Sequence, residues 1–468
     1  MQKQDDVPGS FRDRLYTIDE SGKRVWVFAK KPKGRLTTAR NITGILLMVF
    51  FFTAPFIKIN GQQLLLFDFL HRTFVIFGVQ FWPQDFNLFF IGMISLMVFI
   101  ILFTVTYGRI WCGWACPQTI FMELLFRRIE YVIDGDSHKQ KELTARPWDT
   151  DKIIRRVLKH GVFYLISFII SNYFLMYVMG SDAWIKLVTE SPALHIGGLT
   201  AMAIFSFIFY FIFSWFREQV CTIVCPYGRL QGVLLDRETV VITYDYNRGE
   251  ERGPLRKSEN RSETTKGDCI DCNQCVVVCP TGVDIRNGTQ LECINCACCI
   301  DACNDMMLKV GFRPGLIRYA SEKMIAEKRP WHFTVRSGAY TVVLSVLLIA
   351  LSYFLFSRNP VEATVLRSPG MLFQEQDSGR ISNLYSVKVV NKTMHDLPLE
   401  MKDLSGAGMV KVIGNNPVIA KQSVGEVVFF ILMDRSKIKS SKTEVEIGIF
   451  SRGKKLDQTR ATFVGPEK

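Results

Sequence analysis

Histidine is scarce in this sequence, and cysteine is missing from both of its ends. The chain has 6 histidines and 13 cysteines, and all the cysteines lie between Cys112 and Cys303. His160 and His195 precede two different apolar segments and would lie at opposite membrane faces, so a haem held by two histidines is not expected. No glycine-rich nucleotide fingerprint follows an expected strand, which leaves a nicotinamide or flavin site without support. No cysteine follows Cys303, so the C-terminal segment contains no disulfide.

The first 40 residues contain no apolar run of the kind found in a cleavable signal peptide. They are polar and charged, and we interpret residues 1–40 as a cytoplasmic arm. We therefore expect the first membrane span itself to direct insertion into the membrane.

Long apolar runs, in contrast, are abundant. A helix needs about 20 mostly apolar residues to cross a hydrocarbon layer of about 30 Å, because it rises about 1.5 Å per residue. One such run could be a buried core helix, but five indicate membrane spans. The five runs are Asn41–Ile59, Leu88–Tyr107, Gly161–Met179, Ile196–Trp215 and Ser337–Phe356.

The formal charge of +13 comes from an uneven distribution of lysine and arginine. Cytoplasmic loops carry the excess of these residues. The basic residues of the arm and of the segment after the second run include Lys30, Lys31, Lys33, Arg35, Arg109, Arg127, Arg128, Arg155 and Arg156. Segments 60–86 and 180–194 have one each, Arg72 and Lys186, as expected outside. Five spans then place the C-terminal segment outside, and membrane lipid, not nucleic acid, is the expected counter-charge.

The remaining segments predict two folded domains. Residues 216–336 are polar and too long for a simple loop, so they form a cytoplasmic domain between the four spans of residues 41–215 and the fifth span at 337–356. Residues 361–468 show short alternating apolar runs, which predict an all-β immunoglobulin-like sandwich. The expected strands include Tyr385–Val390, Met409–Val412, Val424–Met433 and Thr443–Phe450.

Eight cysteines of the polar insert follow the spacing of a two-cluster ferredoxin. They are Cys269, Cys272, Cys275 and Cys279, then Cys293, Cys296, Cys299 and Cys303. Three closely spaced thiolates can hold one side of a four-iron cluster, and the fourth comes from the other run. The expected ligand sets are Cys269, Cys272, Cys275 and Cys303 for the first 4Fe-4S cluster, and Cys293, Cys296, Cys299 and Cys279 for the second.

A pair of zinc sites is the alternative, because zinc also binds Cys-x2-Cys pairs. Zinc would leave four of the eight cysteines unexplained by their spacing. Two residues depart from the usual ferredoxin run. Asn304 stands where a second proline is common, and Cys298 is an extra thiol beside Cys299. We interpret Cys298 as a spare buried thiol, although a register one residue away would exchange its role with Cys299.

An internal repeat brings in four more cysteines. A shift of 109 residues superimposes Cys112-x3-Cys116-Pro117 on Cys221-x3-Cys225-Pro226. Residues four apart share one helix face, so each pair can present two sulfurs to one point. Each proline should end one helix and begin another. That places the second cysteine of each pair at the positive end of a new helix, which favours the thiolate.

Four thiolates brought together by the repeat could hold a third cluster, bind copper as Cu(I), or cycle between dithiol and disulfide. The spacing leaves these three possibilities open. Trp111 and Trp114 flank the first pair, and we expect them in the aromatic belt of the membrane interface and not as electron relays.

On these motifs the chain resembles the CcoG family, also called FixG or RdxA, of accessory proteins of the cbb-type cytochrome c oxidase. The likeness covers both Cys-x3-Cys-Pro motifs, the two-cluster insert, the fifth span and the immunoglobulin-like domain. It implies a multi-pass protein of the bacterial inner membrane, with a periplasmic C-terminal domain, that reduces Cu(II) to Cu(I) for oxidase assembly. By this resemblance the catalytic thiols are those of Cys112, Cys116, Cys221 and Cys225, and the partners are oxidase assembly factors or a copper transporter.

The paired motifs are also similar to those of NapH and NosR, which are polyferredoxins linked to quinol. Two other functions therefore stay open: a quinol-linked carrier without a metal substrate, and a non-enzymatic copper-binding scaffold. The expected fold class is an α-helical membrane protein with five transmembrane helices, a cytoplasmic two-cluster ferredoxin-like insert and a C-terminal all-β immunoglobulin-like domain. The electron donor is not identified by the sequence.

Overall fold

The computed structural model describes residues 17–466, with gaps at 19–20, 22, 60, 70–72, 82–85, 257–260, 262–263, 331, 358–360, 369–372, 377–378, 394, 407, 415–416, 422 and 439. The first 16 residues of the arm and Arg72 of the expected outer loop lie outside the described residues. The chain divides into two compact units, Met1–Phe77 with Pro83–Ala350 and Gly78–Trp82 with Leu351–Lys468. Each unit is described by itself.

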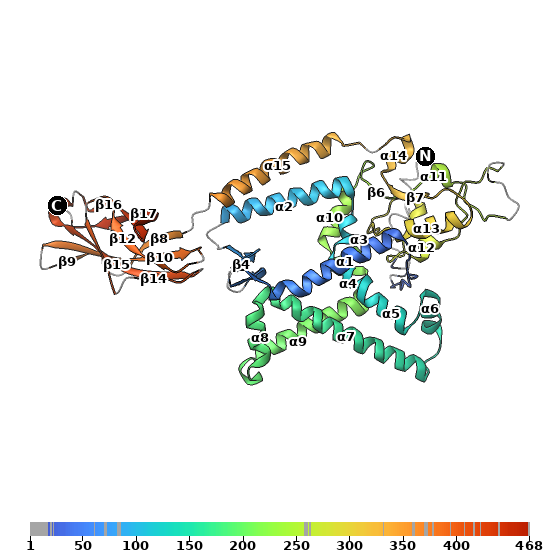
Figure 1. Ribbon diagram of the computed structural model, residues 1–468, viewed down its shortest axis with the longest axis horizontal. Coiled ribbons are helices and arrows are strands. Elements are labelled where there is room, and N and C mark those ends of the chain that lie inside the picture. Colours follow the sequence, from blue (N-terminus) through green and yellow to red (C-terminus); the bar gives the residue numbers. More distant parts are fainter. Residues whose placement is uncertain are drawn as a thin grey trace. The chain divides into compact units, whose positions relative to one another are not determined.

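Five long helices coincide with the five apolar runs (Figure 1). They are α1 (Arg35–Thr53), α2 (Phe86–Tyr107), α7 (Thr150–Met179), α9 (Ile196–Phe211) and α15 (Val335–Phe356). All five are long and apolar enough to cross a membrane, once the short turns that extend α1 and α9 are included. Helix α7 begins eleven residues before the predicted run, because the Asp149 carboxylate accepts the N–H of Lys152 at 2.9 Å and caps a polar first turn.

Helix α1 also begins earlier than predicted, and a residue of the insert is the reason. The Asp301 carboxylate accepts the backbone N–H groups of Leu36 at 3.2 Å and Thr37 at 2.7 Å. A negative charge at a helix N-terminus satisfies free N–H groups and opposes the helix dipole. Gly34 makes this approach possible, since a Cβ there would lie 2.2 Å from the Asp301 Cγ. The cap thus docks the insert against the first long helix.

Shorter elements complete the helical part of the first unit. They are α3 (Ile110–Trp114), α4 (Pro117–Phe121), the π-helix η4 (Met122–Phe126), α5 (Arg127–Ile133), α6 (Ser137–Ala145), α8 (Ser181–Thr189), the π-helices η6 (Ile212–Phe216) and η7 (Val220–Val224), and α10 (Pro226–Leu234). Strands β1 (Lys58–Ile59), β2 (Gln62–Gln63), β3 (Leu65–Asp68) and β4 (Thr73–Ile76) form short antiparallel pairs, β1 with β2 and β3 with β4. An aromatic core joins the helices, with the rings of Phe126 and Phe213 stacked 4.5 Å apart.

The ferredoxin-like insert is built on a two-stranded antiparallel sheet of β6 (Val241–Tyr244) and β7 (Ile317–Ala320). Its helices are α11 (Tyr246–Gly249), α12 (Gln274–Val277), α13 (Cys298–Lys309) and α14 (Glu322–Glu327). The two cysteine runs lie between these strands in the chain. Buried side chains of both strands and of α13 share one core with four of the cysteines.

The C-terminal unit is a β-sandwich, and the predicted immunoglobulin-like fold is confirmed. The first sheet has the strand order β13 (Gly408–Val412), β15 (Val424–Asp434), β10 (Arg380–Asn391) and β8 (Val361–Arg367), and β9 (Gln374–Gln376) pairs with β10 as well. The second sheet has the strand order β12 (Glu400–Asp403), β16 (Lys442–Ser451) and β17 (Lys454–Val464). Strands β11 (Leu397–Pro398) and β14 (Val418–Ile419) pair separately, and β5 (Val79–Phe81) is a further short strand. All four predicted strands are present. The buried Tyr385 donates its hydroxyl to Thr462 O of the other sheet at 2.8 Å.

Candidate functional site

The two Cys-x2-Cys-x2-Cys loops have the same backbone conformation. Asp271 and Asn273 have φ angles of 51° and 56°, and Asn295 and Ala297, at the same offsets in the second run, have 55° and 65°. Each loop then enters a helix, α12 after Asn273 and α13 after Ala297. Left-handed residues are uncommon outside glycine, so four at matching offsets fix the register. Cys299 therefore corresponds to Cys275, and the extra thiol of Cys298 occupies a non-ligand position.

The first predicted ligand set lies together in the core of the insert. Cys269, Cys275 and Cys303 are buried in one apolar cluster. The charges of Cys269 and Cys272 act on the thiol of Cys303, which comes from the other run, so all four thiols are neighbours. Burial raises the pKa of Cys275 and of Cys303 to about 12, which keeps these thiols protonated until a metal displaces the protons.

The four cysteines of the second predicted set line one small cavity. Cys279 comes from the first run and Cys293, Cys296 and Cys299 from the second, and Cys275 of the first predicted set also reaches its wall. Isoleucine and valine side chains form much of the remaining wall. A thiol-lined, apolar cavity of this kind fits a four-iron cluster, which supplies one-electron transfer when bound. Within the described part of the chain, no three His, Cys, Asp or Glu side chains are arranged to hold a single metal ion.

Cys298 and Asn304, the two departures from the usual run, both have structural roles. The Arg40 guanidinium donates to the Cys298 sulfur at 3.3 Å, and a hydrogen bond from the Cys298 thiol lowers the pKa of Cys296. The amide oxygen of Asn304 accepts the N–H of Gly315 at 2.8 Å and ties α13 to the next loop. Cys298 is therefore a buried neighbour of a ligand position.

The repeated thiol pairs lie in one region of the first unit. The charges of Cys116, Cys112 and Cys225 act on the thiol of Cys221, and we call these four residues the thiol quartet. Cys116 is the N-cap of α4 and Cys225 the N-cap of α10, and both helices begin at the proline that follows. Burial raises the pKa of Cys112 to about 11 and of Cys221 to about 12. The Cys112 thiol also donates to Gln231 Oε1 at 3.1 Å.

A direct backbone contact joins the thiol quartet to the second ligand set. Gly113 follows Cys112 on α3, and a Cβ at this position would lie 2.4 Å from Ile294 O and 2.9 Å from the backbone N of Cys296. Real Cβ atoms do not approach backbone so closely, so the contact requires glycine. Cys112 also shares a buried apolar cluster with Cys296. The quartet and the second set therefore adjoin each other.

One tryptophan departs from its predicted place. Trp111 is half-exposed, in keeping with an interfacial residue. Trp114 packs instead into the core of the insert, and its indole N–H donates to the Tyr319 hydroxyl at 3.1 Å. Tyr319 in turn donates to Asn295 O, between Cys293 and Cys296, at 2.8 Å. Trp114 is thus partly buried against the insert, a packing that the interface-belt prediction did not include.

Arg109 lies in the site, whereas the sequence pattern counts it only among the basic residues that predict the cytoplasmic side of the membrane. Its side chain is buried, with 3% exposed, and it donates to Leu291 O. The guanidinium lies against the first turn of α10, because a Cβ built on Gly228 would come 2.8 Å from the Arg109 Nη2 atom. Its positive charge acts on Cys112 and Cys221 and on Cys293. Arg109 thus offsets negative charge on both centres, and its position shortly before Cys112 in the repeat was the available signal.

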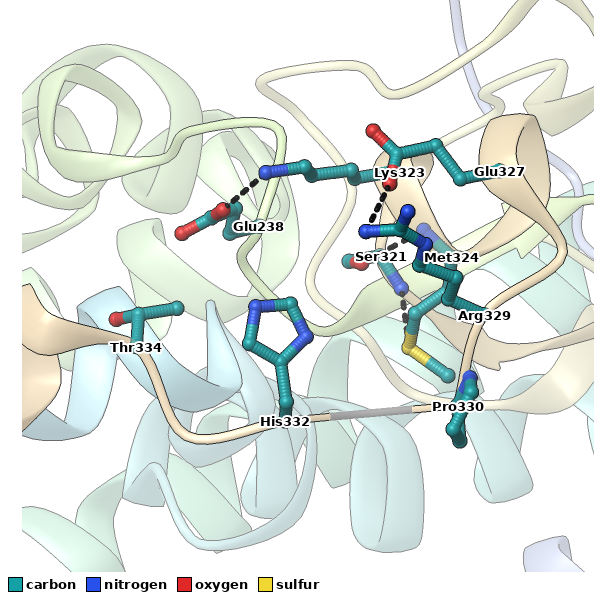
Figure 2. Close-up of a pocket in the computed structure, with 9 residues that line it drawn as sticks. All are labelled: Glu238, Ser321, Lys323, Met324, Glu327, Arg329, Pro330, His332 and Thr334. Atoms are coloured by element: carbon teal, nitrogen blue, oxygen red, sulfur yellow. Dashed lines mark hydrogen bonds and ion pairs between the residues drawn. The ribbon is translucent and has the colours of Figure 1, made fainter.

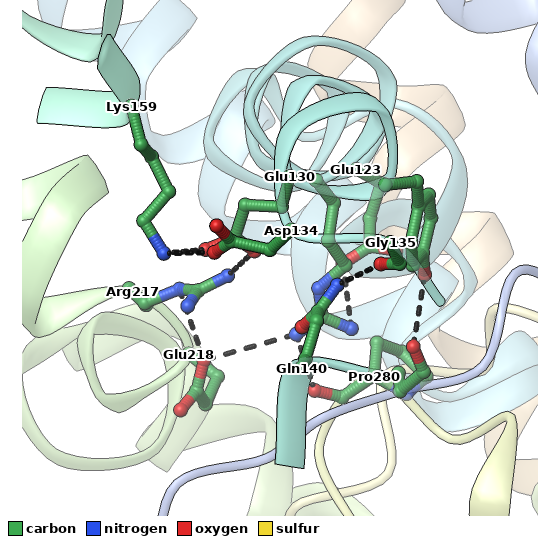
Figure 3. A network of polar contacts seen from close by, with 12 residues as sticks. Glu123, Glu130, Asp134, Gly135, Gln140, Lys159, Arg217, Glu218 and Pro280 are labelled. Atoms are coloured by element: carbon green, nitrogen blue, oxygen red, sulfur yellow. Dashed lines mark hydrogen bonds and ion pairs between the residues drawn. The ribbon is translucent and has the colours of Figure 1, made fainter. Parts of the chain in front are cut away.

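A buried network of charged residues lies near Cys221, which shares a cavity wall with Arg217 and Glu218. Figure 3 shows Lys159 directed at Glu130 and Asp134, with Arg217 between Glu130 and Glu218. Burial alone would raise the pKa of Glu130, but Arg217 and Lys159 outweigh it and hold the pKa below its ordinary value. The Glu130 carboxylate stays ionised, and its ion pairs bind the helices to one another.

The same network reaches the insert through Arg127. Its guanidinium donates to Pro280 O at 3.0 Å and forms an ion pair with Glu123 at 3.4 Å. A small cavity lies here, and its wall includes Cys221, Glu123, Glu218 and Arg127. Cys221 of the second pair therefore faces a cavity that has charged side chains in its wall. Arg127, like Arg109, is a buried functional charge that the sequence pattern assigns to topology alone.

The fold and the assembled thiols define a class, an iron–sulfur electron-transfer protein with five helices able to cross a membrane. Family models agree: residues 216–322 match a 4Fe-4S dicluster domain, residues 89–133 a 4Fe-4S binding domain, and residues 351–466 the Ig-like fold at the C-terminal of FixG.

Individual relatives specify the class further. Nitrogen fixation protein FixG of Rhizobium meliloti is 33% identical over 417 residues, which cover 79% of this chain and 77% of that protein. Protein RdxA of Cereibacter sphaeroides is 34% identical over 359 residues, 74% of each chain. Ferredoxin-type protein NapH of Haemophilus influenzae is 22% identical over 240 residues, 47% of this chain and 68% of that protein. The chain belongs to the FixG family, as its motifs predict.

Proposed function

We propose that this chain is a membrane-bound electron-transfer protein that reduces Cu(II) to Cu(I) at the thiol quartet, for assembly of a cbb-type cytochrome c oxidase. The observation that carries the proposal is the contact of Gly113 with the backbone of Cys296, which brings the quartet against the second ligand set. Each Cu(II) ion gains one electron and becomes Cu(I), with no bond to carbon made or broken. Oxidase assembly factors or a copper transporter would receive the product.

The residues of the chain contribute to this reaction through binding and charge. Thiolate is a soft ligand and prefers Cu(I), so the quartet favours the reduced ion. The buried Arg109 offsets the negative charge of the thiolates that hold it. Cys269, Cys272, Cys275 and Cys303, with Cys279, Cys293, Cys296 and Cys299, would hold the two clusters. The crowding of the basic residues supports an insert on the cytoplasmic side and a periplasmic C-terminal domain.

A copper assay with matched variants tests the proposal. The purified full chain, reduced with dithionite and freed of the reductant, is mixed with Cu(II) and a chromogenic Cu(I) chelator. We expect the Cys112→Ser/Cys221→Ser variant to lose Cu(I) formation while keeping its eight-cysteine insert loaded with iron, and the Cys298→Ser control to keep both. Unchanged Cu(I) formation in the double variant would remove the quartet from the reaction.

The likeness to ferredoxin-type NapH favours a second candidate, electron transfer from quinol to a partner protein without a metal substrate. The optical spectrum of the clusters separates the two candidates. Bleaching of the iron–sulfur absorption by a quinol, in the absence of copper and unaffected by the Cys112→Ser/Cys221→Ser change, would favour the second candidate.

A further inference from the structure

A large open cleft lies on the side of the insert near the first ligand set. Its volume is about 470 Å³, and its lining includes Arg248, Arg318, Lys328 and Arg329 against one carboxylate, Asp245. The cleft shares Arg329 with a smaller cavity, and Figure 2 shows the Arg329 side chain beside Glu327, with Lys323 directed at Glu238. Side chains at the rim are exposed, Arg329 to 72% and Arg318 to 42%. Arg318 pairs with Asp245 and Arg329 with Glu327, so the lining is accessible and carries a net positive charge that is partly balanced by ion pairs.

Arg248 connects this cleft to the first ligand set. Its guanidinium pairs with Asp268, and the Asp268 N–H donates to Arg248 O at 2.9 Å, directly before Cys269. The positive charge of Arg248 also acts on the thiol of Cys303. A molecule bound against Arg248 would thus lie close to the ligands of the first cluster.

We propose that this cleft docks an acidic one-electron carrier protein, which supplies the electrons for the proposed function. The cationic, exposed lining suits the small, polar and salt-sensitive encounters of electron-transfer proteins. One electron passes from the reduced carrier to the centre held by the chain, so the carrier is oxidised by one electron and no proton or bond is transferred. The inference rests on the proposed function for the fate of the electron, but the docking itself does not depend on copper.

The test measures binding and not turnover. A plant-type acidic ferredoxin, in its oxidised form, is titrated onto the full chain in detergent at ionic strengths of about 0.01 M and about 0.1 M, where the screening length falls from about 30 Å to about 10 Å. We expect clear weakening at the higher salt. The variant Lys328→Glu/Arg329→Glu should bind at least about tenfold more weakly, because it places like charges opposite the acidic carrier.

The matched control is Lys139→Glu/Lys141→Glu on α6, which makes the same change of net charge at an exposed place away from the cleft. Its binding should stay within about twofold of the wild type. Equal weakening in both variants would mean a general charge effect and overturn the proposal, as would unchanged binding in the cleft variant. Iron content equal to the wild type shows that each variant is folded.

Two further measurements distinguish a small-molecule occupant from a protein, and the docking site from the copper reaction. Free reduced flavin mononucleotide that binds in the cleft and displaces the ferredoxin would make the occupant a small anionic molecule and overturn the docking of a protein. Copper reduction with dithionite as donor should be the same in the cleft variant and the wild type. If dithionite-reduced wild type makes no Cu(I) while ferredoxin still needs Lys328 and Arg329 to bind, the proposed function fails and the docking site stands.

Discussion

The two copies of the Cys-x3-Cys-Pro repeat have the same backbone design but opposite surroundings. Gly108 and Arg217, four residues before the first cysteine of each copy, both have positive φ angles, 58° and 51°. The next residue is buried in both copies, yet it is Arg109 in the first and Glu218 in the second. Cys112 lies in a regular α-helix, whereas Cys221 lies in a π-helix. The repeat therefore keeps the fold of the loop and reverses its charge.

The copies also face different neighbours. Gly113 lies against the insert, and the matching residue of the second copy is Thr222. Cys221 lines a cavity whose wall also has Glu123 and Glu218. If the proposed function holds, the two copies have different roles: the first contacts the second predicted ligand set, and the second faces a cavity with charged groups that an incoming ion could enter. Substitutions at matched positions test this difference between the copies.

The largest effect is expected at Gly113. In Gly113→Val the new side chain would meet the backbone of Ile294 and Cys296, which cannot move as a flexible side chain would. Overpacking costs about 1–3 kcal/mol, and where this cost is met by separating α3 from the insert, copper reduction should fall by about fivefold to a hundredfold. The rate of Cu(I) chelate formation measures it, with iron content as the check on folding.

Thr222→Val is the matched control in the second copy. Threonine and valine have nearly the same shape, and Thr222 makes one long hydrogen bond, at 3.5 Å to Gln219 O. We expect copper reduction close to that of the wild type. If both substitutions reduce the rate equally, the functional difference between the copies does not exist.

The next effect concerns the reversed charges. Removing the guanidinium in Arg109→Met should weaken Cu(I) binding by about tenfold, because thiolates that hold the ion lose a buried positive neighbour. Glu218→Gln, at the matched position, should not weaken it and should strengthen it slightly. Competition with a Cu(I) chelator gives both affinities. The Arg109→Lys variant shows whether the affinity for Cu(I) depends on the positive charge or on the planar guanidinium, because lysine keeps the charge and lacks the planar group.

A smaller effect is expected from pH in the reduced, metal-free protein. Folding raises the pKa of Cys112 from 9.0 to about 11 and of Cys221 to about 12. The unfolded thiols then ionise first, so the stability that neutral burial contributes is complete below about pH 9 and is lost progressively as pH rises toward 11 and 12. The midpoint of thermal unfolding should fall over this range. In Cys112→Ser/Cys221→Ser the alkaline fall should be smaller, and an identical fall would contradict the assignment.

The sequence predicted what depends on local pattern. Apolar runs of spanning length, alternating strands and cysteine spacing are local, and all of these features are present in the structure. The buried contacts of Arg109, Arg127 and Trp114 could not be predicted, because they are made with residues distant in the chain. The sequence around a basic residue that follows a span looks the same whether its side chain faces water or a buried carboxylate. The sequence did not single out Gly113, because the requirement for glycine there comes from its contact with the backbone of Ile294 and Cys296 in the insert.

The smallest effect compares the adjacent thiols of the second run. The shared left-handed residues make Cys299, not Cys298, the counterpart of Cys275. Cys298→Ala should therefore keep the full iron content and cost about 1 kcal/mol, the worth of a typical buried hydrogen bond. Cys299→Ala should lose the iron of the second set, which iron analysis and low-temperature EPR would detect. Loss of that iron in Cys298→Ala, with Cys299→Ala unaffected, would reverse the register and with it the correspondence between the two loops.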